Sequence, residues 1–594
     1  MTTPTPQPHE DLLRRIRELE KEVAHWRNQV SHQQYGLVWM DVPEAFDAES
    51  LHSIPILEEV NDLSFYQEDG KPTHILIEGD NYHSLTCLNY THRNSIDVIY
   101  IDPPYNTGND GFTYKDSRFI TEHPNGQPLK KNHPLRHSAW LSFMAKRLRL
   151  AKELLKEDGV IFISIGNNEL AQLNLLVHQI WDEQNCLGIV TRIQKKGSDK
   201  GNFFTPTADY ILAYAKNATM LNKFFQPITA SFPLLETVGK HKGEYYEASK
   251  SLYQSSLDSR PNQRYYIECP DGSFVIPPGN VFPSEIKDGA FVVPDSNKDK
   301  CWRWSWDSYL EKKDRIVFKR TKRSPLLNEK GESASWNVYT KRYEKEAAEK
   351  GNVPPNIIED CINALGTSRL SDLDIDFPFP KPVELVSKLI QITNKKKDIK
   401  VVDFFAGSGT TLDAVTQLNA KDGGRRQCIL CQASEADICR SVTLERNRRV
   451  MQGYTNAKGE EVKGLGGSLK FYRTAFVGRH TAREASDADR IDLAARAGCL
   501  LALAENTLYE TERAERFQFF TDHNGRHTAI YFNEDYSDFP AFETHLRSLT
   551  GSTAIYVFSW GDGTEFAPMF DDLPNVVVKS IPQPILDIYK SLNT

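Results

Sequence analysis

The sequence lacks any long apolar run, and its cysteines are few and scattered. No uninterrupted apolar stretch reaches the roughly 18 residues of a membrane-spanning helix, so we expect no membrane association. The amino terminus has no apolar core like that of a signal peptide. The nine cysteines suggest neither a disulfide framework nor a zinc site, because Cys428 and Cys431 have no second pair. We therefore expect a cytoplasmic protein without a metal site.

An excess of positive charge is also missing. The formal net charge of −8 argues against a uniformly basic nucleic-acid-binding protein. A local basic groove can still attract phosphates, and one segment concentrates seven cations: Lys312, Lys313, Arg315, Lys319, Arg320, Lys322 and Arg323. This segment is either a solvated face or a DNA-contacting surface. The length of 594 residues, with 39% hydrophobic residues, predicts two to four folded domains.

Apolar runs alternate with helical periods in two parts of the chain. The predicted strands are residues 75–80, 97–102, 159–165, 210–214, 399–405 and 427–432. The predicted helices are residues 138–157, 170–181, 382–392 and 437–452. Strands that are apolar throughout and alternate with helices indicate a parallel sheet covered on both faces.

Other parts of the chain break this rhythm. Residues 217–365 are rich in Lys, Pro, Gly, Tyr and Trp, and they predict an inserted domain of mixed type. Trp302, Trp304 and Trp306 alternate as on a strand, so one face would carry all three, either packed or facing DNA. Residues 10–27 predict a helix with a short apolar seam. Beyond Gly467 we expect a separate unit with helices at 489–509 and 582–592 and strands at 515–520, 527–532, 553–559 and 575–578.

Asp102-Pro103-Pro104-Tyr105 directly follows one predicted strand. An exocyclic amine is a poor nucleophile because its lone pair is delocalised into the ring. Two fixed acceptors, the Asp102 carboxylate and the Pro103 carbonyl, would aim that lone pair at a methyl donor. The prolines stiffen the loop, and Tyr105 offers a face for stacking an extruded base. A simple strand-terminal turn is the alternative, because Asp-Pro-Pro is a natural turn sequence.

Residues 402–411, Val-Asp-Phe-Phe-Ala-Gly-Ser-Gly-Thr-Thr, predict a strand, a glycine turn and the start of a helix. Gly407 and Gly409 let the backbone approach a ligand, and the helix N-terminus favours a carboxylate. No lysine follows the second glycine, which excludes a phosphate-binding P-loop. S-adenosylmethionine has a carboxylate at its methionine end and suits this loop.

The order of the two motifs is informative, since the Asp-Pro-Pro-Tyr strand comes about 300 residues before the glycine loop. The chain thereby resembles the β class of DNA amino-methyltransferases, in which the catalytic half precedes the cofactor half and a target-recognition domain separates them. Phe379-Pro-Lys381-Pro382 is similar to the motif that opens the cofactor half, and Glu78-Gly79-Asp80-Asn81 to the acidic turn before the catalytic strand. Glu435 stands where the family places an acid that accepts ribose hydroxyls, although Ala433-Ser434 replaces the usual Leu-Pro before it.

Within that class the chain resembles modification (Mod) subunits of type III restriction-modification systems. The local matches are residues 25–28, 35–39, 302–304, 366–367 and 579–589. The resemblance implies a Rossmann-like, S-adenosylmethionine-dependent methyltransferase fold of the α/β class. It also implies a homodimer, a restriction (Res) subunit as partner, and methyl transfer to N6 of adenine in double-stranded DNA. Cytosine-N4 methylation is the alternative, but family members with that activity usually carry Ser in place of Asp102. A DNA-reading specificity subunit without catalysis is a second alternative.

The resemblance divides the chain into five parts. They are an N-terminal helical segment (1–60), the catalytic half (61–216), the inserted target-recognition domain (217–365), the cofactor half (366–465) and a small α+β C-terminal domain (466–594).

The two motifs and the resemblance give three sets of predicted site residues. The predicted catalytic residues are Asp102, Pro103, Pro104 and Tyr105. The predicted cofactor-binding residues are Asp80, Lys381, Asp403, Phe405, Gly407, Ser408, Gly409, Thr410 and Glu435. The predicted DNA-binding residues are Lys195, Lys196, Lys319, Arg320, Lys322 and Arg323. Near the first two of these, Phe204 and Tyr210 either stack on or wedge beside a flipped base, or pack in the core.

Overall fold

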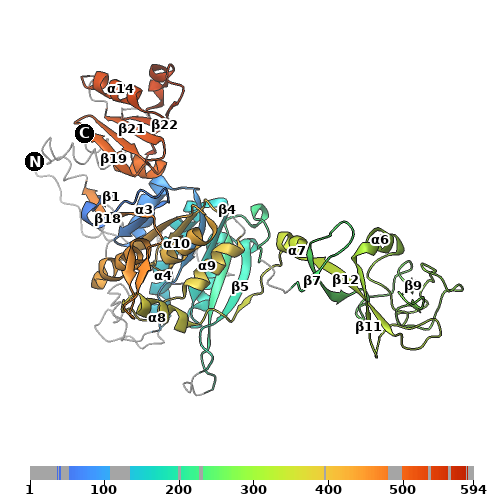
Figure 1. Ribbon diagram of the computed structural model, residues 1–594. Coiled ribbons are helices and arrows are strands. Elements are labelled where there is room, and N and C mark those ends of the chain that lie inside the picture. Colours follow the sequence, from blue (N-terminus) through green and yellow to red (C-terminus); the bar gives the residue numbers. More distant parts are fainter. Residues whose placement is uncertain are drawn as a thin grey trace, which may run out of the picture. The chain divides into compact units, whose positions relative to one another are not determined.

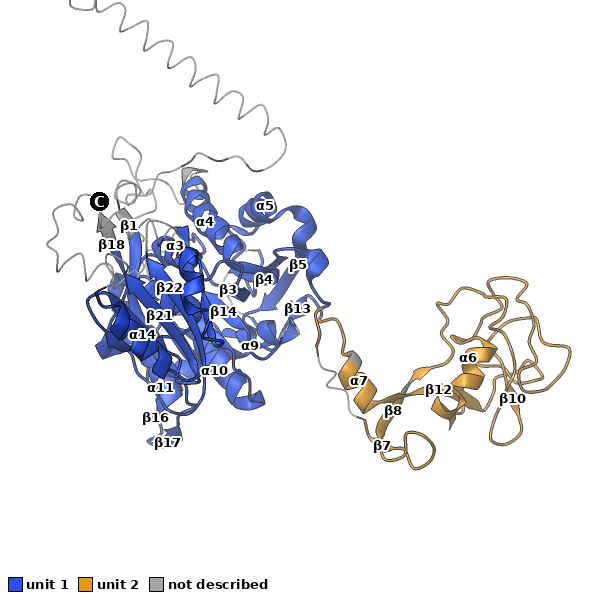
Figure 2. Ribbon diagram, turned by 90° about the horizontal axis from the view of Figure 1, so that it is seen from above, with its two compact units in different colours: residues 1–223, 355–594 blue, residues 224–354 orange. Residues whose placement is uncertain are grey.

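The computed structural model describes residues 37, 39, 41, 53–107, 134–197, 203–226, 232–393, 396–478, 498–532, 537–558, 563–583 and 585. The chain forms two compact units (Figure 2). The larger unit comprises residues 1–223 and 355–594, and the smaller unit comprises residues 224–354. The expected helix at 10–27 lies outside the described residues. Among those that are described, no helix combines the length and apolar character needed to cross a membrane.

Ten strands of the described chain form one mixed sheet in the larger unit (Figure 1). In spatial order they are β1 (Ser53–Glu59), β18 (Ser468–Gly478), β2 (Thr73–Glu78), β15 (Gln427–Gln432), β14 (Lys400–Asp403), β3 (Ile96–Ile101), β4 (Leu155–Ile165), β6 (Ala208–Ala215), β5 (Cys186–Ile193) and β13 (Ile357–Ile358). Neighbours from β18 to β4 pair in parallel. β6 is antiparallel to both β4 and β5. This sheet confirms the predicted α/β fold.

Helices cover both faces of the sheet, as Figure 2 shows. One group is α3 (Asn81–Thr91), α4 (Pro134–Leu154) and α5 (Leu170–Trp181). The other is α9 (Val383–Ile392), α10 (Thr410–Asp422) and α11 (Glu445–Gln452), and α8 (Asn363–Asp372) precedes α9. The predicted helix at 138–157 is three residues too long, because the chain is already extended in β4 at Leu155.

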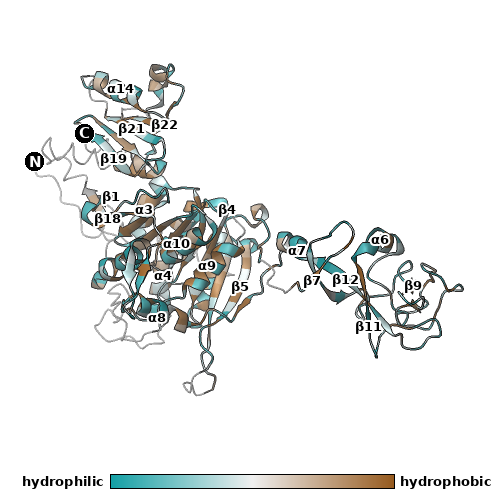
Figure 3. Cartoon of the chain, viewed as in Figure 1, coloured by the Kyte–Doolittle hydropathy of each residue, from teal (hydrophilic) through white to brown (hydrophobic). Residues whose placement is uncertain are grey.

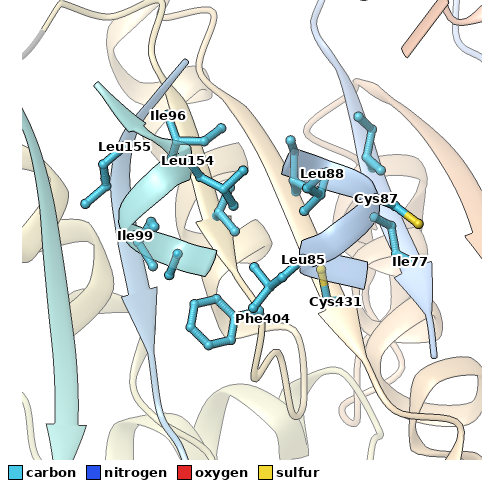
Figure 4. Close-up of a cluster of buried hydrophobic side chains, with 14 of the residues drawn as sticks. Ile77, Leu85, Cys87, Leu88, Ile96, Ile99, Leu154, Leu155, Phe404 and Cys431 are labelled. Atoms are coloured by element: carbon cyan, nitrogen blue, oxygen red, sulfur yellow. The ribbon is translucent and has the colours of Figure 1, made fainter. Parts of the chain in front are cut away.

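The core of the larger unit explains why its strands read as continuous apolar runs. All residues of β3 are buried, since both faces of the sheet are covered. Figure 3 shows the hydrophobic colouring concentrated on the strands of this sheet. The central cluster in Figure 4 joins Leu85 and Leu88 of α3 to Phe404 beyond β14. Cys431 lies in the same cluster, and Cys428 is buried beside it on β15, so the Cys-x-x-Cys pair packs in the core.

The smaller unit is built on a four-stranded antiparallel sheet among its described residues. The strands are β11 (Ile316–Arg320), β12 (Trp336–Tyr343), β8 (Tyr245–Ser251) and β7 (Leu234–Leu235), in that order. The remaining elements are β9 (Ile267–Glu268), β10 (Phe274–Val275), α6 (Trp306–Glu311) and α7 (Glu344–Lys350). The unit spans fewer residues, 224–354, than the expected insert 217–365. The difference includes β13 (Ile357–Ile358), which pairs with β5 in the large sheet.

The three tryptophans of the smaller unit pack in its core. Trp302 is fully buried, and Trp304 and Trp306 pack partly buried against the same cluster. Their expected strand is wrong, since Trp302 makes only an isolated bridge and Trp306 begins α6 after the Ser305 cap.

The C-terminal part of the larger unit contains a second sheet, of five strands among the described residues. These are β19 (Tyr509–Arg513), β20 (Phe517–Thr521), β21 (Arg526–Phe532), β22 (Ser552–Phe558) and β23 (Val576–Val578), accompanied by α14 (Phe539–Ser548). The described part of the helix expected at 489–509 spans 498–505. The expected boundary at 466 differs from the structure, because β18 returns the chain to the large sheet between β1 and β2. Two short strands, β16 (Gly453–Thr455) and β17 (Glu461–Lys463), form a hairpin before it.

Candidate active site

The two sequence motifs meet on adjacent parallel strands. β14 pairs with β3 through Val401 with Val98 and Val402 with Ile99. The loops that follow both strands therefore leave the sheet at the same edge. From this point the chain proceeds from β14 to β15 on one side and from β3 to β4 on the other. Such a switch point is where open α/β sheets bind ligands.

Asp102, the first residue after β3, is paired with Lys381. The Lys381 ammonium lies 2.6 Å from Asp102 Oδ2 and 5.0 Å from the centroid of the Tyr105 ring. The other carboxylate oxygen, Asp102 Oδ1, is buried and accepts no hydrogen bond from any described residue. Oδ1 is therefore the oxygen best placed to accept an N–H from a substrate.

The tetrapeptide is held by residues that the sequence motif does not include. Trp140 of α4 is fully buried and donates its indole N–H to the Pro104 carbonyl at 2.8 Å. The Tyr105 ring lies over Gly166, where a Cβ would approach Tyr105 Cδ2 to 2.8 Å. Only glycine at 166 leaves the ring in this position.

The next residue, Asn106, adopts a left-handed conformation with φ of 52°. Its side-chain amide donates to Glu169 Oε1 at 2.6 Å, and His137 Nδ1 contacts the same oxygen at 2.6 Å. Burial raises the pKa of Glu169, while these two contacts lower it. The cluster fixes the exit of the catalytic loop against the start of α5.

A buried ion pair stands beside the catalytic loop. Arg192 of β5 donates to Asp209 Oδ2 of β6 at 2.8 Å and to the Cys361 carbonyl at 2.7 Å. Burial raises the pKa of Asp209, the nearby charges of Lys381 and Arg192 lower it, and that of Asp102 raises it. Asp209 thus belongs to the same electrostatic neighbourhood as Asp102, a relation that no local sequence pattern reveals.

Asp403, the last residue of β14, holds the two ends of the glycine loop together. Its carboxylate accepts the Phe405 N–H at 3.0 Å and the Thr411 hydroxyl at 2.5 Å. Complete burial raises the pKa of Asp403 to about 7. Its hydrogen bonds therefore fix the conformation of the glycine loop.

The two glycines of the loop have different surroundings. Gly407 has a φ of 52°, and a Cβ added there would have its nearest neighbour, an atom of the Phe377 ring, 3.6 Å away. Gly409 has a φ of 78°, and a Cβ there would lie 2.3 Å from Asn447 Nδ2. Both positions favour glycine by backbone conformation, but only Gly409 is also closed by packing.

A π-helical turn, η6 (Cys439–Leu444), supports the loop from behind. Thr443 donates to the Gly407 carbonyl at 2.6 Å, and Asn447 of the following α11 donates to the Gly409 carbonyl at 3.3 Å. Turns of this type are frequent at functional sites. The predicted helix at 437–452 therefore contains a local widening that places Thr443 against the loop.

Arg446 holds the same loop by hydrogen bonds to two side chains of the loop. The buried guanidinium donates at 2.9 Å to both Ser408 Oγ and Thr410 Oγ1 and pairs with Asp413 Oδ2 at 2.9 Å. Ser408 and Thr410 are themselves buried. Their hydroxyl groups are thus engaged in shaping the loop, and Arg446 was not predicted from the sequence.

The acidic turn after β2 is joined to the cofactor loop. Asp80 caps α3 by accepting the Tyr82 N–H at 2.7 Å, and the buried Arg147 lies 3.2 Å from it. Asn81 donates to the Phe404 carbonyl at 3.1 Å. The Phe405 ring centroid lies 6.0 Å from that of Phe143. The half-buried Glu435 begins a short turn that two residues separate from the end of β15.

A family model described as DNA methylase matches residues 96–443, from β3 to the π-helical turn. The match includes both motifs and the smaller unit. The chain belongs to the DNA methylase family. This methylase is 31% identical to the type III restriction-modification enzyme EcoPI Mod subunit of Escherichia phage P1, over 72% of this chain and 66% of that protein. It is 28% identical to the EcoP15I Mod subunit of Escherichia coli, over 75% and 69% of the two chains.

A type II methyltransferase of Klebsiella pneumoniae, M.KpnI, is 29% identical over 64% of the methylase and 84% of its own length. Alignments to the first two Mod subunits span about two thirds of those proteins. Among solved structures, a protein of Thermus thermophilus described as a DNA modification methylase aligns over 67% of this chain and 99% of its own, with 14% identity and a TM-score of 0.30. That similarity is too weak to add to the assignment.

The predicted DNA-contacting cations of the methylase lie in different surroundings. Lys195 and Lys196 follow β5, in the larger unit. In the smaller unit, Lys319 donates to the Ala248 carbonyl at 2.7 Å and Arg320 lies 3.4 Å from Asp271. Lys322 and Arg323, in the turn after β11, are exposed and form no ion pair with a described residue. DNA contact by these six residues remains a prediction.

Proposed function

We propose that this methylase transfers a methyl group from S-adenosylmethionine to N6 of a flipped adenine in double-stranded DNA. One observation carries the proposal: Asp102 and the Gly407 loop share one sheet edge, where the buried Asp102 Oδ1 has no hydrogen-bond partner among the described residues. The type III Mod relatives support the choice of adenine.

S-adenosylmethionine fits the residues at this edge. A Cβ at Gly407 would meet its nearest neighbours only at van der Waals distance, 3.6 Å or more, and the first turn of α10 has backbone N–H groups that suit a carboxylate. Glu435, after β15, stands where a carboxylate accepts ribose hydroxyls. When bound, the cofactor supplies an electrophilic methyl group.

The chain's own residues then act on the target amine. Asp102 Oδ1 and the Pro103 carbonyl accept the two N–H bonds and direct the nitrogen lone pair toward the methyl group. Asp102 would accept the proton that the nitrogen loses on methylation and pass it to solvent. Tyr105, held over Gly166, stacks on the flipped base.

Cytosine-N4 methylation uses the same amine chemistry and is the nearest alternative. Asp102 favours adenine, because the cytosine-N4 enzymes of the β class, which this chain resembles, usually have Ser at this position. A specificity subunit without catalysis is the other alternative, and the intact Asp102–Lys381 pair disfavours it.

We further propose that the methylase is a Mod subunit of a type III restriction-modification system. It would act in the cytoplasm as a homodimer and associate with a Res subunit. The similarity to the EcoPI and EcoP15I Mod subunits supports this proposal.

Methylome sequencing tests the proposal directly. A host without adenine methylases would express either the wild-type chain or Asp102→Ala. We expect N6-methyladenine at a specific site with the wild type and none with the variant, which should still bind S-adenosylmethionine in calorimetry. N4-methylcytosine would establish the cytosine alternative. Site-specific DNA binding without any methylation would establish the specificity subunit.

A further inference from the structure

Two adjacent phenylalanines are almost wholly exposed in the connection between β5 and β6. The exposed fractions are 93% for Phe203 and 92% for Phe204. Tyr210, seven positions after Phe203, instead packs partly against the main core. For Phe204, the structure therefore excludes the core-packing interpretation.

The direction of the strands places these residues at the catalytic edge. β4 and β5 are both antiparallel to β6, so they run the same way as each other and as β3. Tyr210 of β6 pairs with Ile165, the last residue of β4, and with Thr191 near the end of β5. The β5–β6 connection therefore leaves the sheet at the edge that carries Asp102.

The other side of the same connection is basic. A hydrogen bond of 2.9 Å from Gln194 N–H to the Thr207 carbonyl extends the strand pairing, and Lys195 and Lys196 follow at once. Neither lysine forms an ion pair with a described residue, and Lys196 is exposed. We call Lys195, Lys196, Phe203 and Phe204 the β5–β6 arm.

We propose that the β5–β6 arm binds the DNA duplex, with its lysines on the phosphate backbone and its phenylalanines in the base stack beside the flipped nucleotide. Apolar side chains that enter a base step unstack it, and lysines neutralise phosphates. The inference rests on the proposed function, because it requires a base that leaves the duplex to reach Asp102.

The position of the arm favours DNA over a protein partner. A duplex that delivers a base to Asp102 must approach the edge from which the arm projects. Two lysines without an ion-pair partner among the described residues complement its phosphates, and two exposed aromatic rings gain a partner when they stack on bases. A protein seated on this edge would obstruct the approach of the substrate.

Single-turnover methyl transfer tests the role of the phenylalanines. One duplex would contain the target adenine, at the site found by methylome sequencing, paired with thymine, and a second would have an abasic site opposite it. The variant is Phe203→Ala/Phe204→Ala. The control is Met220→Ala, because Met220 is 60% exposed in η3 (Ala218–Met220), after β6 has returned to the opposite edge.

We expect the double variant to lose at least about tenfold in rate on the paired duplex and to stay within about twofold of the wild type on the abasic duplex, where the base leaves the stack easily. Met220→Ala should match the wild type on both. We also expect an effect of the double variant Lys195→Gln/Lys196→Gln on DNA binding. The slope of log K, the DNA association constant, against log salt concentration should become shallower by about 1.8, because each lost phosphate contact removes about 0.9.

Three results would overturn the proposal. These are an unchanged rate on the paired duplex, an equal loss on both duplexes, and dissociation of an oligomer by the phenylalanine variant in mass photometry, which would assign the arm to an interface between copies. A wild-type chain that methylates neither duplex would instead contradict the proposed function.

Discussion

Lys381 and Asp102 are 279 positions apart in sequence, yet their charged groups lie 2.6 Å apart. The backbone around Lys381 is held on two sides. Its carbonyl accepts the Thr410 hydroxyl at 3.3 Å, and Gly366 fits so closely that a Cβ there would lie 2.4 Å from the Pro380 carbonyl oxygen. The ion pair thus joins the rigid start of the cofactor half to the catalytic loop.

We predict that Lys381→Met slows methyl transfer by about 10-fold to 100-fold, the scale of a misplaced catalytic group, and changes cofactor affinity by less than about threefold. Lys381→Arg keeps the cation and should recover part of the rate. Single-turnover kinetics and calorimetry measure the two quantities separately. A lost cofactor affinity with an unchanged rate at saturation would place Lys381 on the cofactor, as the sequence motif predicts.

Asp403 makes stability depend on pH. Burial raises its pKa to about 7, whereas an unfolded aspartate titrates near 3.9. Between these values the folded state binds more protons than the unfolded state, so stability falls as pH rises, by up to about 4 kcal/mol. Asp403→Asn removes this titration. The stability of the variant relative to wild type should therefore rise between pH 5 and 7 and then level off.

Urea denaturation of the cofactor-free chain over this pH range measures the effect. Asp422→Asn is the matched control, because the adjacent Arg426 lowers the pKa of Asp422, which stays ionised throughout. Parallel pH curves for wild type and Asp403→Asn would show that Asp403 does not titrate in this window.

Much of the sheet was predictable because both of its faces are buried. The apolar run of β15 gave its bounds, 427–432, and the apolar period of α5 gave 170–181. β5 was missed because most of its residues are only half-buried, so its sequence carries no continuous apolar run. β18 was missed because its place depends on pairing with β1 and β2, which no local pattern encodes.

The site residues that belong to a contiguous sequence motif were predictable. The residues that reach the site only through tertiary packing were not. The positions of Asp102 and Gly407 at one edge follow from two strand-ending loops. The supports of these loops, such as Trp140 and Arg446, lie on helices whose side-chain contacts arise only from tertiary packing. Contacts of the predicted residues with cofactor and DNA remain predictions.

Arg446 and Asp413 form a fully buried ion pair under the glycine loop. We predict that Arg446→Met destabilises the chain by about 1–3 kcal/mol, because the buried Asp413 carboxylate loses one of its two arginine partners and keeps Arg369 at 3.1 Å. The variant should also weaken cofactor binding through Ser408 and Thr410. Arg446→Met/Asp413→Asn should lose less stability than the two single variants added together. Additive losses in urea denaturation would show that the pair is not coupled.

The two loop glycines should respond differently to substitution. Gly409→Ala adds a clash with Asn447 to backbone strain, whereas Gly407→Ala adds strain alone, about 1–2 kcal/mol. The melting temperature should therefore fall further for Gly409→Ala. Gly407→Asp should abolish cofactor binding, because its carboxylate would face that of the methionine moiety. Unchanged cofactor affinity in calorimetry would remove Gly407 from the binding site.

Of the four predicted DNA-contacting cations in the smaller unit, Lys322 and Arg323 are exposed and form no ion pair with a described residue. Lys322→Gln/Arg323→Gln should weaken DNA binding and reduce the slope of log K against log salt concentration by about 1.8. The matched control is Lys313→Gln/Arg315→Gln, because these side chains are already paired with Asp288 and Glu346 at 3.2 and 2.5 Å. The control removes the same charge from the same unit, so an equal change in slope would indicate a diffuse field. If the salt slope of the Lys322→Gln/Arg323→Gln variant is unchanged, these two residues belong to a solvated face that does not contact DNA.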